Sequence, residues 1–526
     1  MVFPIANSPL RTQDKTCPNQ VSLWRLLTDQ GVVTQDVLDY ESIGLGTESD
    51  PYIVGWVERD LRNPRNPMNS SLQCKVTITF VTALATLIVS LSSSAYAGGM
   101  ECVINSFHVS ERVATLGLFL FVLGFSVVPL VWAPLSEHLG RQTSFFVSFV
   151  CLAAFTAGCA GARNIHTLLI LRFFAGAVGL SLITNAGGVV SDMFAARQRG
   201  LALCLLAATP YFGPSLGPII GGFLGMNAGW RWVQILLAIS SGVVWVLRAQ
   251  RLSLVTGKYY RSAFDTQREN VPVRQQMQKV FLRPWVLLLR EPIVLLLSIY
   301  ASLIYSTLYM LFAAFPVVYG ENRGWNAGVS GLPFLGAMTR TLLGAFYTLY
   351  GNKRYIKAQQ RAGGPASPEE RLHPYMVSSP TIPIGLFWFA WTNSASIHWI
   401  SSVLALVPFG FGLILIYLGI VNYLIDSYTI FAASVLAGMS ILRYLFGAVF
   451  PLFTLYMYRA MGVHWASSVP AFLSTSCFPF PFLFYKYGPA IRKHCKYAAL
   501  AQQHLQNLDN APVPQPVAGG NTAGGV

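Results

Sequence analysis

Residues 172–222 read RFFAGAVGLSLITNAGGVVSDMFAARQRGLALCLLAATPYFGPSLGPIIGG, two apolar segments joined by a short charged link. The second segment carries glycines and prolines that repeat every four residues: Gly213, Gly217 and Gly221, and Pro214 and Pro218. Residues four apart share one helical face, so these glycines let another backbone come very close. Each proline removes an intrahelical hydrogen bond, which neighbouring helices can compensate in a bilayer. The pattern therefore predicts a membrane helix with one face that packs closely against another helix and takes part in function.

The composition of the whole chain indicates lipid as its solvent. Of 526 residues, 53% are hydrophobic and only 11% are charged, whereas soluble domains carry about 25% charged residues. The eight cysteines are scattered and several lie in apolar segments, which fits small buried side chains better than a disulfide or metal framework. The net charge of +15 is spread over several loops without a nucleic-acid-binding module, so no nucleic-acid partner is expected.

Apolar segments long enough to span a bilayer, about 20 residues each, occur six times before residue 250 and six times after residue 290. The first six run over residues 75–97, 113–134, 143–162, 165–190, 200–225 and 231–247. The second six run over residues 292–319, 327–350, 375–392, 399–425, 428–457 and 464–485. This predicts an all-α integral membrane protein with 12 transmembrane helices in two six-helix bundles.

The predicted boundaries divide the chain into five parts. These are an N-terminal tail (1–74), a first bundle (75–250), a central loop (251–290), a second bundle (291–487) and a C-terminal tail (488–526), whose end after Tyr497 is expected to be disordered. Nine arginines and lysines lie between residues 248 and 290, and the loop after the eighth span and the C-terminal tail are also basic. By the positive-inside rule, both tails and the central loop are predicted to be cytosolic.

Three motifs occur in an order that resembles a known family. WAPLSEHLGRQ (132–142) resembles the loop between spans two and three of the major facilitator superfamily. LRFFAGAVG (171–179) and GPSLGPIIGG (213–222) resemble the fourth-span motif and the fifth-span antiporter signature of its drug:proton antiporters. The chain is similar to the fungal twelve-span members of that family over about residues 50–499.

The resemblance implies the major facilitator fold and a proton-coupled exporter in the plasma membrane. Its expected substrates are hydrophobic or cationic organic compounds such as drugs, polyamines or secondary-metabolite toxins. The proton gradient and the membrane potential would supply the energy, so no cofactor is expected, and the protein is expected to act as a monomer. A nutrient importer on the same fold and a transport-dead sensor or receptor are the alternatives. Neither a P-loop nor an HExxH or CxxC motif is present, so no enzyme activity and no metal site are predicted.

Arg172 matches the family arginine that is linked to proton coupling. An ionised side chain inside a span costs at least about 2.5 kcal/mol unless it faces the interior or water. The alternative is a structural arginine that pairs with backbone carbonyls.

The loop motif contributes Glu137, Gly140 and Arg141, which resemble the acid, the glycine and the base of an interbundle latch. Asp192 and Arg199 are expected to be partners of that latch. The alternative is an ordinary charged turn that only fixes orientation.

The glycine and proline face of span five, which also includes Gly222, is expected to seal the cytosolic side and to bend during exchange. Any tightly packed helix pair would show the same pattern, and that alternative stays open.

Cavity walls in this architecture come from spans one, four, seven and ten. The substrate-cavity candidates are Asn185, Tyr305, Tyr309, Phe312, Asn422 and Tyr423. The three aromatic residues of span seven fall at i, i+4 and i+7 and so share one face, which suits amphiphilic or cationic molecules. For each residue simple packing is an equal alternative. Asp426 ends span ten and is predicted to be a gate or a helix cap; the proton carrier is not identified.

Two departures from the family pattern concern spans six and eight. Val246-Leu247-Arg248 runs directly into the basic loop, which leaves span six near the lower length limit of about 17 residues. A short deletion from a wrongly predicted splice junction would explain this. Arg340 stands inside span eight, where it binds an anion, pairs with an acid or simply reaches water.

Overall fold

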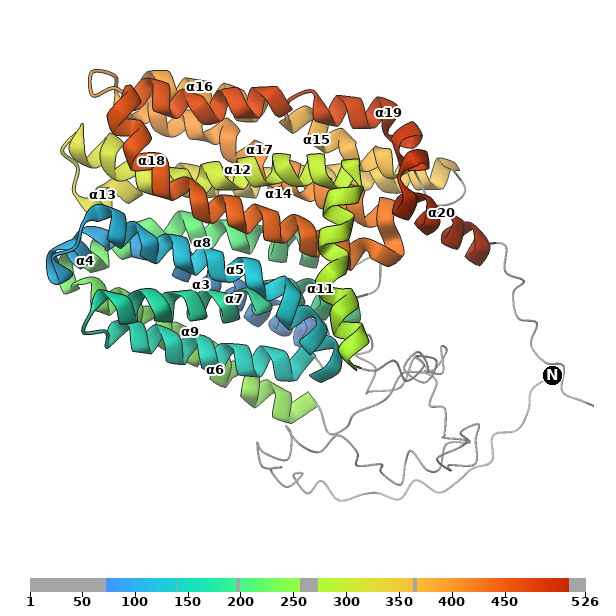
Figure 1. The fold of residues 1–526 in the computed structure, drawn as a ribbon, viewed down its shortest axis with the longest axis horizontal. Coiled ribbons are helices and arrows are strands. Elements are labelled where there is room, and N and C mark those ends of the chain that lie inside the picture. Colours follow the sequence, from blue (N-terminus) through green and yellow to red (C-terminus); the bar gives the residue numbers. More distant parts are fainter. Residues whose placement is uncertain (1–71, 140, 195–198, 256–272, 363–366, 510–526) are drawn as a thin grey trace, which may run out of the picture. The chain divides into compact units, whose positions relative to one another are not determined.

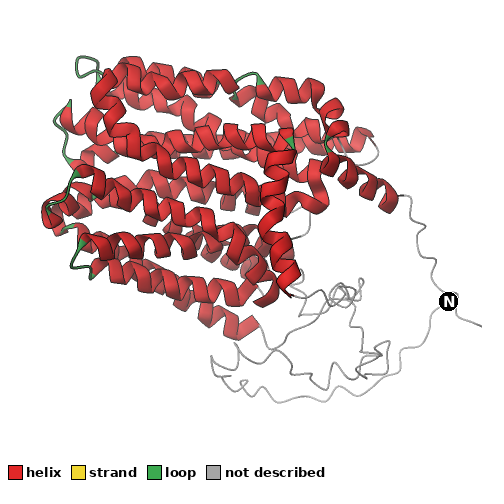
Figure 2. Cartoon of the chain, in the orientation of Figure 1, coloured by secondary structure: helices red, strands yellow, loops and turns green. Residues whose placement is uncertain are grey.

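The computed structural model describes residues 72–139, 141–194, 199–255, 273–362 and 367–509. Throughout these residues the regular secondary structure is helical (Figures 1 and 2). The described residues up to Trp245 and from Val273 onward belong to one compact unit, and residues 246–255 are grouped apart from it.

The first half of the chain contains six long helices and one short one between the first two. They are α3 (Leu72–Gly98), α4 (Met100–Phe107), α5 (Glu111–Leu139), α6 (Arg141–Ala160), α7 (Ile165–Met193), α8 (Arg199–Ala228) and α9 (Trp230–Val255). Each of the six predicted spans in this half falls on one of the long helices. Helix α9 continues eight residues past the predicted end of span six, so the backbone stays helical where the apolar pattern stops.

The second half contains helices that follow the predicted spans with several interruptions. They are α12 (Pro292–Phe315) with the π-helix η2 (Pro316–Glu321), α13 (Ala327–Gly331), α14 (Pro333–Ala362), the 3-10 helix η3 (Pro368–Leu372), α15 (His373–Ser378), α16 (Thr381–Thr392), α17 (Trp399–Tyr428), the 3-10 helix η4 (Thr429–Phe431), α18 (Ala432–Cys477) and α19 (Phe480–His494). Helix α18 runs through the gap predicted between the last two spans. It turns at Gly462, whose φ of 76° is open to glycine and strained for other residues.

Four helical stretches of the described residues are long and apolar enough to cross a membrane by themselves. They are Lys75–Gly98, Pro292–Glu321, Trp399–Tyr428 and Ala432–His494, the last of which contains two predicted spans. Shorter apolar helices occupy further predicted spans, including Phe145–Ala160, Ile165–Ser181 and Trp230–Val244. The count of twelve spans therefore stays a prediction.

Two helices occur where the sequence predicted irregular structure. Helix α11 (Val273–Arg290) lies within the predicted central loop and packs against α18. Helix α20 (Lys496–Asp509) occupies the start of the tail that was predicted to be disordered after Tyr497. Its sequence KYAALAQQHLQNLD is rich in strong helix formers, which outweighs the polarity that led to the prediction of disorder.

Helix contacts are extensive both within each half of the chain and between the halves. In the first half α3 packs along α8, and α7 packs along both α5 and α6. In the second half α12 packs along α18, and α17 packs along α14 and α16 (Figure 1). The halves meet where α5 packs on α18 and where α8 packs on α13 and α14.

Candidate functional site

Arg172 on α7 is almost completely buried, with 1% of its surface exposed. Its partners are three backbone carbonyl oxygens and two aromatic rings: Gly117 at 2.7 Å, Ser92 and Ser93 at 3.5 Å, Tyr96 at 4.3 Å and Phe121 at 4.8 Å. The described residues supply it with no carboxylate partner. These are the contacts of a structural arginine, while its link to proton coupling stays a prediction.

A second buried arginine, Arg443 on α18, lies within a group of tyrosines and is 6% exposed. Its guanidinium carbon lies 4.6 Å from the ring centres of Tyr417 and Tyr444 and 5.0 Å from that of Tyr305. Its Nη2 donates a hydrogen bond to the Tyr444 hydroxyl at 2.7 Å. Arg443 was not among the residues predicted for the site, although it shows the same signal as Arg172, one charge inside an apolar segment.

A chain of polar contacts connects the two arginines across the halves of the protein. The Ser93 hydroxyl on α3 is 3.0 Å from the Tyr309 hydroxyl on α12, and the Tyr305 hydroxyl donates to that of Tyr309 at 3.2 Å. Arg172 donates to the Ser93 carbonyl, and Arg443 lies beside the Tyr305 ring. The predicted aromatic face of α12 therefore lies at the centre, directly between the two guanidinium groups.

A small cavity adjoins Arg443 between the halves. It is lined by Tyr211, Ala301, Ile304, Tyr305, Leu413, Ile416, Tyr417 and Arg443. Its volume of about 10 Å³ is room for about one water molecule. Among the described residues of its lining, only Tyr211, on α8, comes from the first half. Its ring centre is 5.8 Å from that of Tyr417 on α17. An organic substrate therefore needs these walls to separate.

The glycine face of α8 packs directly against the backbone of α3. A Cβ atom added to Gly217 would lie 1.9 Å from Ser94 Oγ, and one added to Gly221 would lie 2.0 Å from the Ala95 carbonyl oxygen. A Cβ on Gly213 would lie 2.3 Å from Ser90 Cβ. The close backbone approach expected of this face is thus present. Ser215, although within the run GPSLG, donates to the Tyr211 carbonyl inside the helix and forms no nucleophile elbow.

One close contact between α8 and the second half lies near the C-terminal end of α8. A Cβ on Gly222 would lie 2.6 Å from the Ala327 carbonyl oxygen on α13. Gly222 is 23 residues, or about 35 Å along the helix axis, from the first residue of α8, Arg199. With Arg199 on the cytosolic side, this contact would close the outer side, because the glycines occupy the C-terminal part of the helix.

The same end of the protein carries an ion pair between the halves. Arg459 on α18 lies 2.8 Å from a carboxylate oxygen of Glu111 on α5 and 3.7 Å from one of Glu321. Together with Gly222, this pair joins the halves at the end that was predicted to be extracellular.

Residues 82–451 match the family model of the Major Facilitator Superfamily, which is more than half of the chain. The chain belongs to the major facilitator superfamily. It is therefore a multi-pass membrane transporter and no enzyme, and the predicted major facilitator fold is confirmed.

Relatives within the superfamily resemble the chain over almost their whole length. It is 54% identical over 522 residues to the "Major facilitator superfamily multidrug transporter mdrA" of Aspergillus fumigatus, which covers 95% of this chain and 86% of that protein. It is also 54% identical to the "MFS-type efflux pump MFS2" of Trichophyton rubrum and 45% identical to the "Efflux pump FUBT" of Fusarium oxysporum, with the same coverage.

A solved structure of the superfamily shares the fold. The proton:xylose symporter XylE aligns with a TM-score of 0.57 at 14% identity, covering 79% of this chain and 96% of that one. At this identity the likeness supports the architecture alone.

Several residues predicted from the superfamily motifs lie outside the described part of the structure. Gly140 is not described, and neither are the side chains of Glu137, Arg141, Asn185, Asp192, Arg199 and Arg340. The latch and the role of Arg340 therefore stay predictions.

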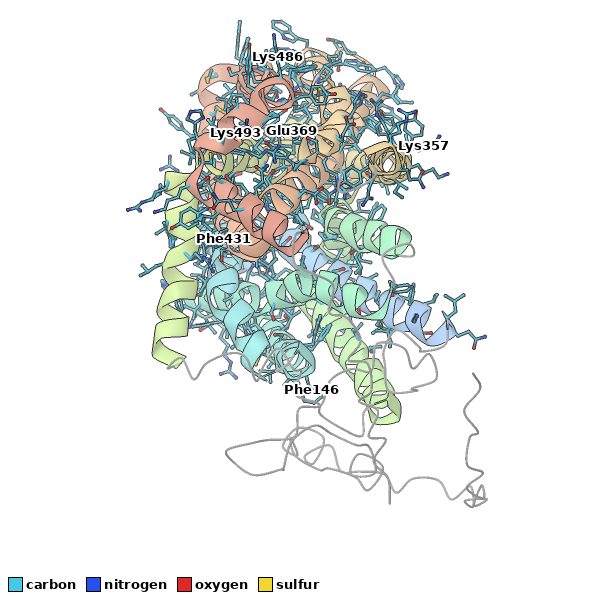
Figure 3. All side chains as sticks on the ribbon, turned by 90° about the vertical axis from the view of Figure 1, so that its right-hand side faces the viewer. Phe146, Lys357, Glu369, Phe431, Lys486 and Lys493 are labelled. Carbon is cyan, nitrogen blue, oxygen red and sulfur yellow. The ribbon has the colours of Figure 1, made fainter. Side chains whose placement is uncertain are left out.

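Tyr423 and Asp426 lie at the end of α17, away from the central tyrosines. A Cβ on Gly488 of α19 would lie 3.2 Å from the Tyr423 hydroxyl and 2.9 Å from Oε1 of Glu369, so both groups face α19. Glu369, which is labelled in Figure 3, is buried, and it pairs with Arg492 at 2.7 Å. Asn422, next to Tyr423, is half-buried. Tyr423, Glu369 and Arg492 thus form a polar cluster near the predicted cytosolic end.

Asp426 is held in an ion pair. Its Oδ2 accepts a hydrogen bond from Nε of Arg371 at 2.8 Å and one from the Tyr355 hydroxyl at 3.2 Å. Burial, followed by the negative charge of Asp426, raises the pKa of Tyr355 above its ordinary value, so this hydroxyl stays a donor. Asp426 thereby connects α17 with the loop after α14.

Replacing Asp426 with asparagine is expected to lower the free energy of unfolding by about 1 kcal/mol, because the pair is only partly buried. Arg371→Gln should lower the free energy of unfolding by about the same amount. The double variant should lose little more than either single variant, because each single substitution already removes the whole ion pair. Thermal unfolding of the purified protein measures this, with Arg354→Gln on α14 as the control. Fully additive losses would contradict the pairing.

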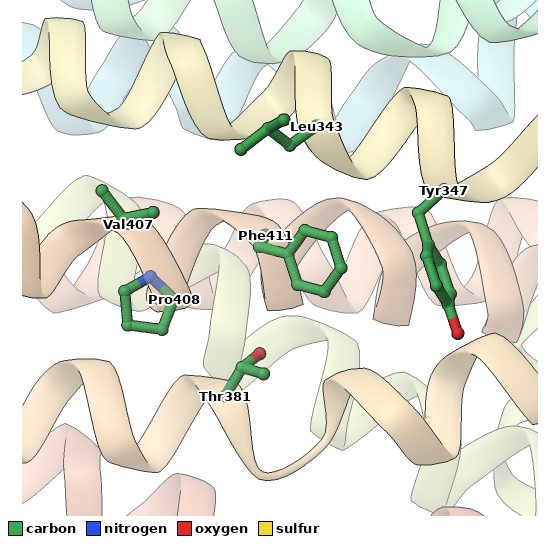
Figure 4. A pocket seen from close by; sticks show the side chains of 6 residues that line it. All are labelled: Leu343, Tyr347, Thr381, Val407, Pro408 and Phe411. Atoms are coloured by element: carbon green, nitrogen blue, oxygen red, sulfur yellow. The ribbon is translucent and has the colours of Figure 1, made fainter.

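An apolar groove of about 590 Å³ lies between α14, α16 and α17, separate from the central site. It is lined by Leu343, Tyr347, Thr381, Val407, Pro408 and Phe411 (Figure 4). The groove is open and its lining is almost wholly apolar, and none of these residues borders the Arg443 cavity. In a membrane transporter such a surface suits lipid chains, and it offers few groups for substrate recognition.

Proposed function

We propose that this transporter is a proton-coupled exporter of amphiphilic organic compounds in the plasma membrane, with both termini in the cytosol. Relatives at 54% identity bear the names multidrug transporter and efflux pump, which supports export. The basic central loop and C-terminal tail support the orientation.

The observation that carries the mechanism is the hydrogen bond between Ser93 and Tyr309, which joins the two halves beside Arg172. Rocking of the bundles would break this link and separate Tyr211 from Tyr417, opening the central cavity to one side. The ion pair of Arg459 and the Gly222 contact would have to open for release to the outside. Alternating access would thus consist of making and breaking these contacts between the halves.

The energy source of the proposed exporter is the proton gradient, because the sequence holds no P-loop for ATP. Each elementary charge moved across the membrane is worth about 2.3 kcal/mol per 100 mV. Apart from Asp426 at the end of α17, the acidic residues near the spans are also at helix ends, such as Glu111, Glu137 and Glu291. We infer that protons load at the ends of spans, and that buried arginines relay the change in charge.

Inside-out vesicles from a host that lacks its own drug pumps test the proposed function. A panel of labelled neutral, anionic and cationic amphiphiles is followed while the vesicle lumen is made acidic. Accumulation that collapses with a protonophore is the expected result. Flux in the opposite sense would indicate an importer, and binding without any flux would indicate a sensor.

A further inference from the structure

Arg443 is a buried cation whose hydrogen-bonding capacity is not used up. With 6% of its surface exposed, it donates one hydrogen bond within the described part of the chain, to the Tyr444 hydroxyl. Its Nε has no hydrogen-bond partner among the described residues, and Arg443 is one of the residues that line the central cavity. A buried, unpaired donor on a charged group is costly, so a partner for it is expected to enter from the cavity.

Within the described part of the chain, no carboxylate pairs with Arg443. The sequence has no Asp or Glu in residues 292–320, 371–425 or 427–508, which include α12, α16, α18 and nearly all of α17. Asp426 is nine residues from Tyr417, about 13 Å along α17, and it is already paired with Arg371. In the first half, Arg172 adds a second positive charge at the far end of the Ser93–Tyr309–Tyr305 chain. The centre of the transporter is therefore electropositive.

The tyrosines around Arg443 complete a site for an amphiphilic molecule. The rings of Tyr305 and Tyr417 lie 5.0 Å and 4.6 Å from the guanidinium carbon and line the cavity together with Arg443, which supplies its positive charge. A planar guanidinium binds a carboxylate through two parallel hydrogen bonds, more strongly than it binds a neutral acceptor. An organic cation would instead meet like charge in a medium of low dielectric constant.

We propose that Arg443 is the binding residue for the anionic group of an organic acid, whose apolar body packs on Tyr305 and Tyr417. This assignment rests on the proposed exporter function and names its substrate class. It replaces the cationic compounds expected from the sequence by monoanionic amphiphiles, because the cavity that opens at Tyr211 has a positive end and no negative one.

Three probes that share one carbon skeleton and differ in charge test the assignment. They are anionic 4-butylbenzoate, its neutral methyl ester and cationic 4-butylbenzylamine. Binding to the purified protein in lipid nanodiscs is measured calorimetrically at pH 7.5, and flux is measured in parallel in vesicles. The wild type is expected to bind the benzoate at least about tenfold more tightly than the amine or the ester, as a charged hydrogen-bonded pair implies.

Variants then assign the preference to Arg443. Arg443→Gln is expected to weaken benzoate binding by at least about tenfold and ester binding by less than about threefold. Arg443→Lys keeps the positive charge but loses the planar guanidinium. Its affinity for the benzoate should lie between those of the wild type and of Arg443→Gln. Arg361→Gln, an exposed arginine on α14, is the matched control and should bind as the wild type does.

The outcomes separate this assignment from the exporter proposal. If the ester or the amine is exported and the wild type does not bind the benzoate more tightly than the other probes, the assignment of Arg443 is overturned. The proposed exporter function is then still supported. If the benzoate binds through Arg443 but none of the three probes is transported, the proposed exporter function is overturned and the assignment of the binding site is supported. Equal losses for all three probes in a folded Arg443→Gln protein would make the residue structural. If that variant does not fold, the wild-type preference alone decides.

Discussion

Gradient-driven efflux is expected to fall by at least about 100-fold, equivalent to about 2.7 kcal/mol, when Arg172 is replaced by alanine. The guanidinium joins the Gly117 carbonyl on α5 to the carbonyls of Ser92 and Ser93 on α3, and it packs on two rings. Removing it leaves these buried acceptors without their donor and opens a void beside the Ser93–Tyr309 link.

The measurement compares initial rates of driven export with substrate exchange in the absence of a gradient. An arginine that only holds the fold would lose both activities together. One that takes part in coupling would keep exchange in the milder variant Arg172→Gln and lose only driven export. Arg361→Ala serves as the control for surface expression. A driven rate in Arg172→Ala within about threefold of the wild type would contradict the prediction.

Gly217→Leu is expected to destabilise the transporter by at least about 3 kcal/mol, the upper part of the range for overpacking. Its Cβ would lie 1.9 Å from Ser94 Oγ and 2.7 Å from the backbone nitrogen of Ala95. Because the second of these atoms belongs to the α3 backbone, the clash can be relieved only if α3 and α8 separate. The midpoint of thermal unfolding in detergent, and the fraction of protein that elutes as a monodisperse species, measure the effect.

The chain offers a matched control for this substitution on another membrane helix. A Cβ added to Gly242 on α9 meets no atom within 4 Å, so Gly242→Leu should leave the unfolding midpoint nearly unchanged. If both leucine variants unfolded at the wild-type temperature, the close contact between α3 and α8 would be refuted.

Periodicity and composition were sufficient to predict most of the helices and one face of close packing. The spacing of Gly213, Gly217 and Gly221 predicted a close backbone approach, and α3 supplies it. Length of apolar sequence, however, could not predict α11, where polar residues are interspersed with apolar ones, or the continuous course of α18 through Gly462. Both depend on tertiary packing, which a count of apolar residues does not contain.

For the site, the sequence predicted the aromatic face of α12 but not what it faces. Tyr305 and Tyr309 lie at the centre, as their spacing suggested, whereas Tyr423 turns toward Glu369 because its place near the end of α17 puts it beside α19. Arg443 was detectable in principle, as a lone charge in an apolar span. That it lies among tyrosines rather than beside an acid depends on helix rotation, which one sequence does not specify.

The small volume of the central cavity makes ligand affinity a property of the conformational equilibrium. A compound larger than a water molecule binds only to the fraction of molecules in which Tyr211 and Tyr417 have moved apart. Its apparent dissociation constant is the intrinsic value divided by that fraction. Substitutions that loosen contacts between the halves, far from Arg443, would then strengthen the binding of all substrates together. The selectivity among substrates would remain a property of the residues around Arg443 itself.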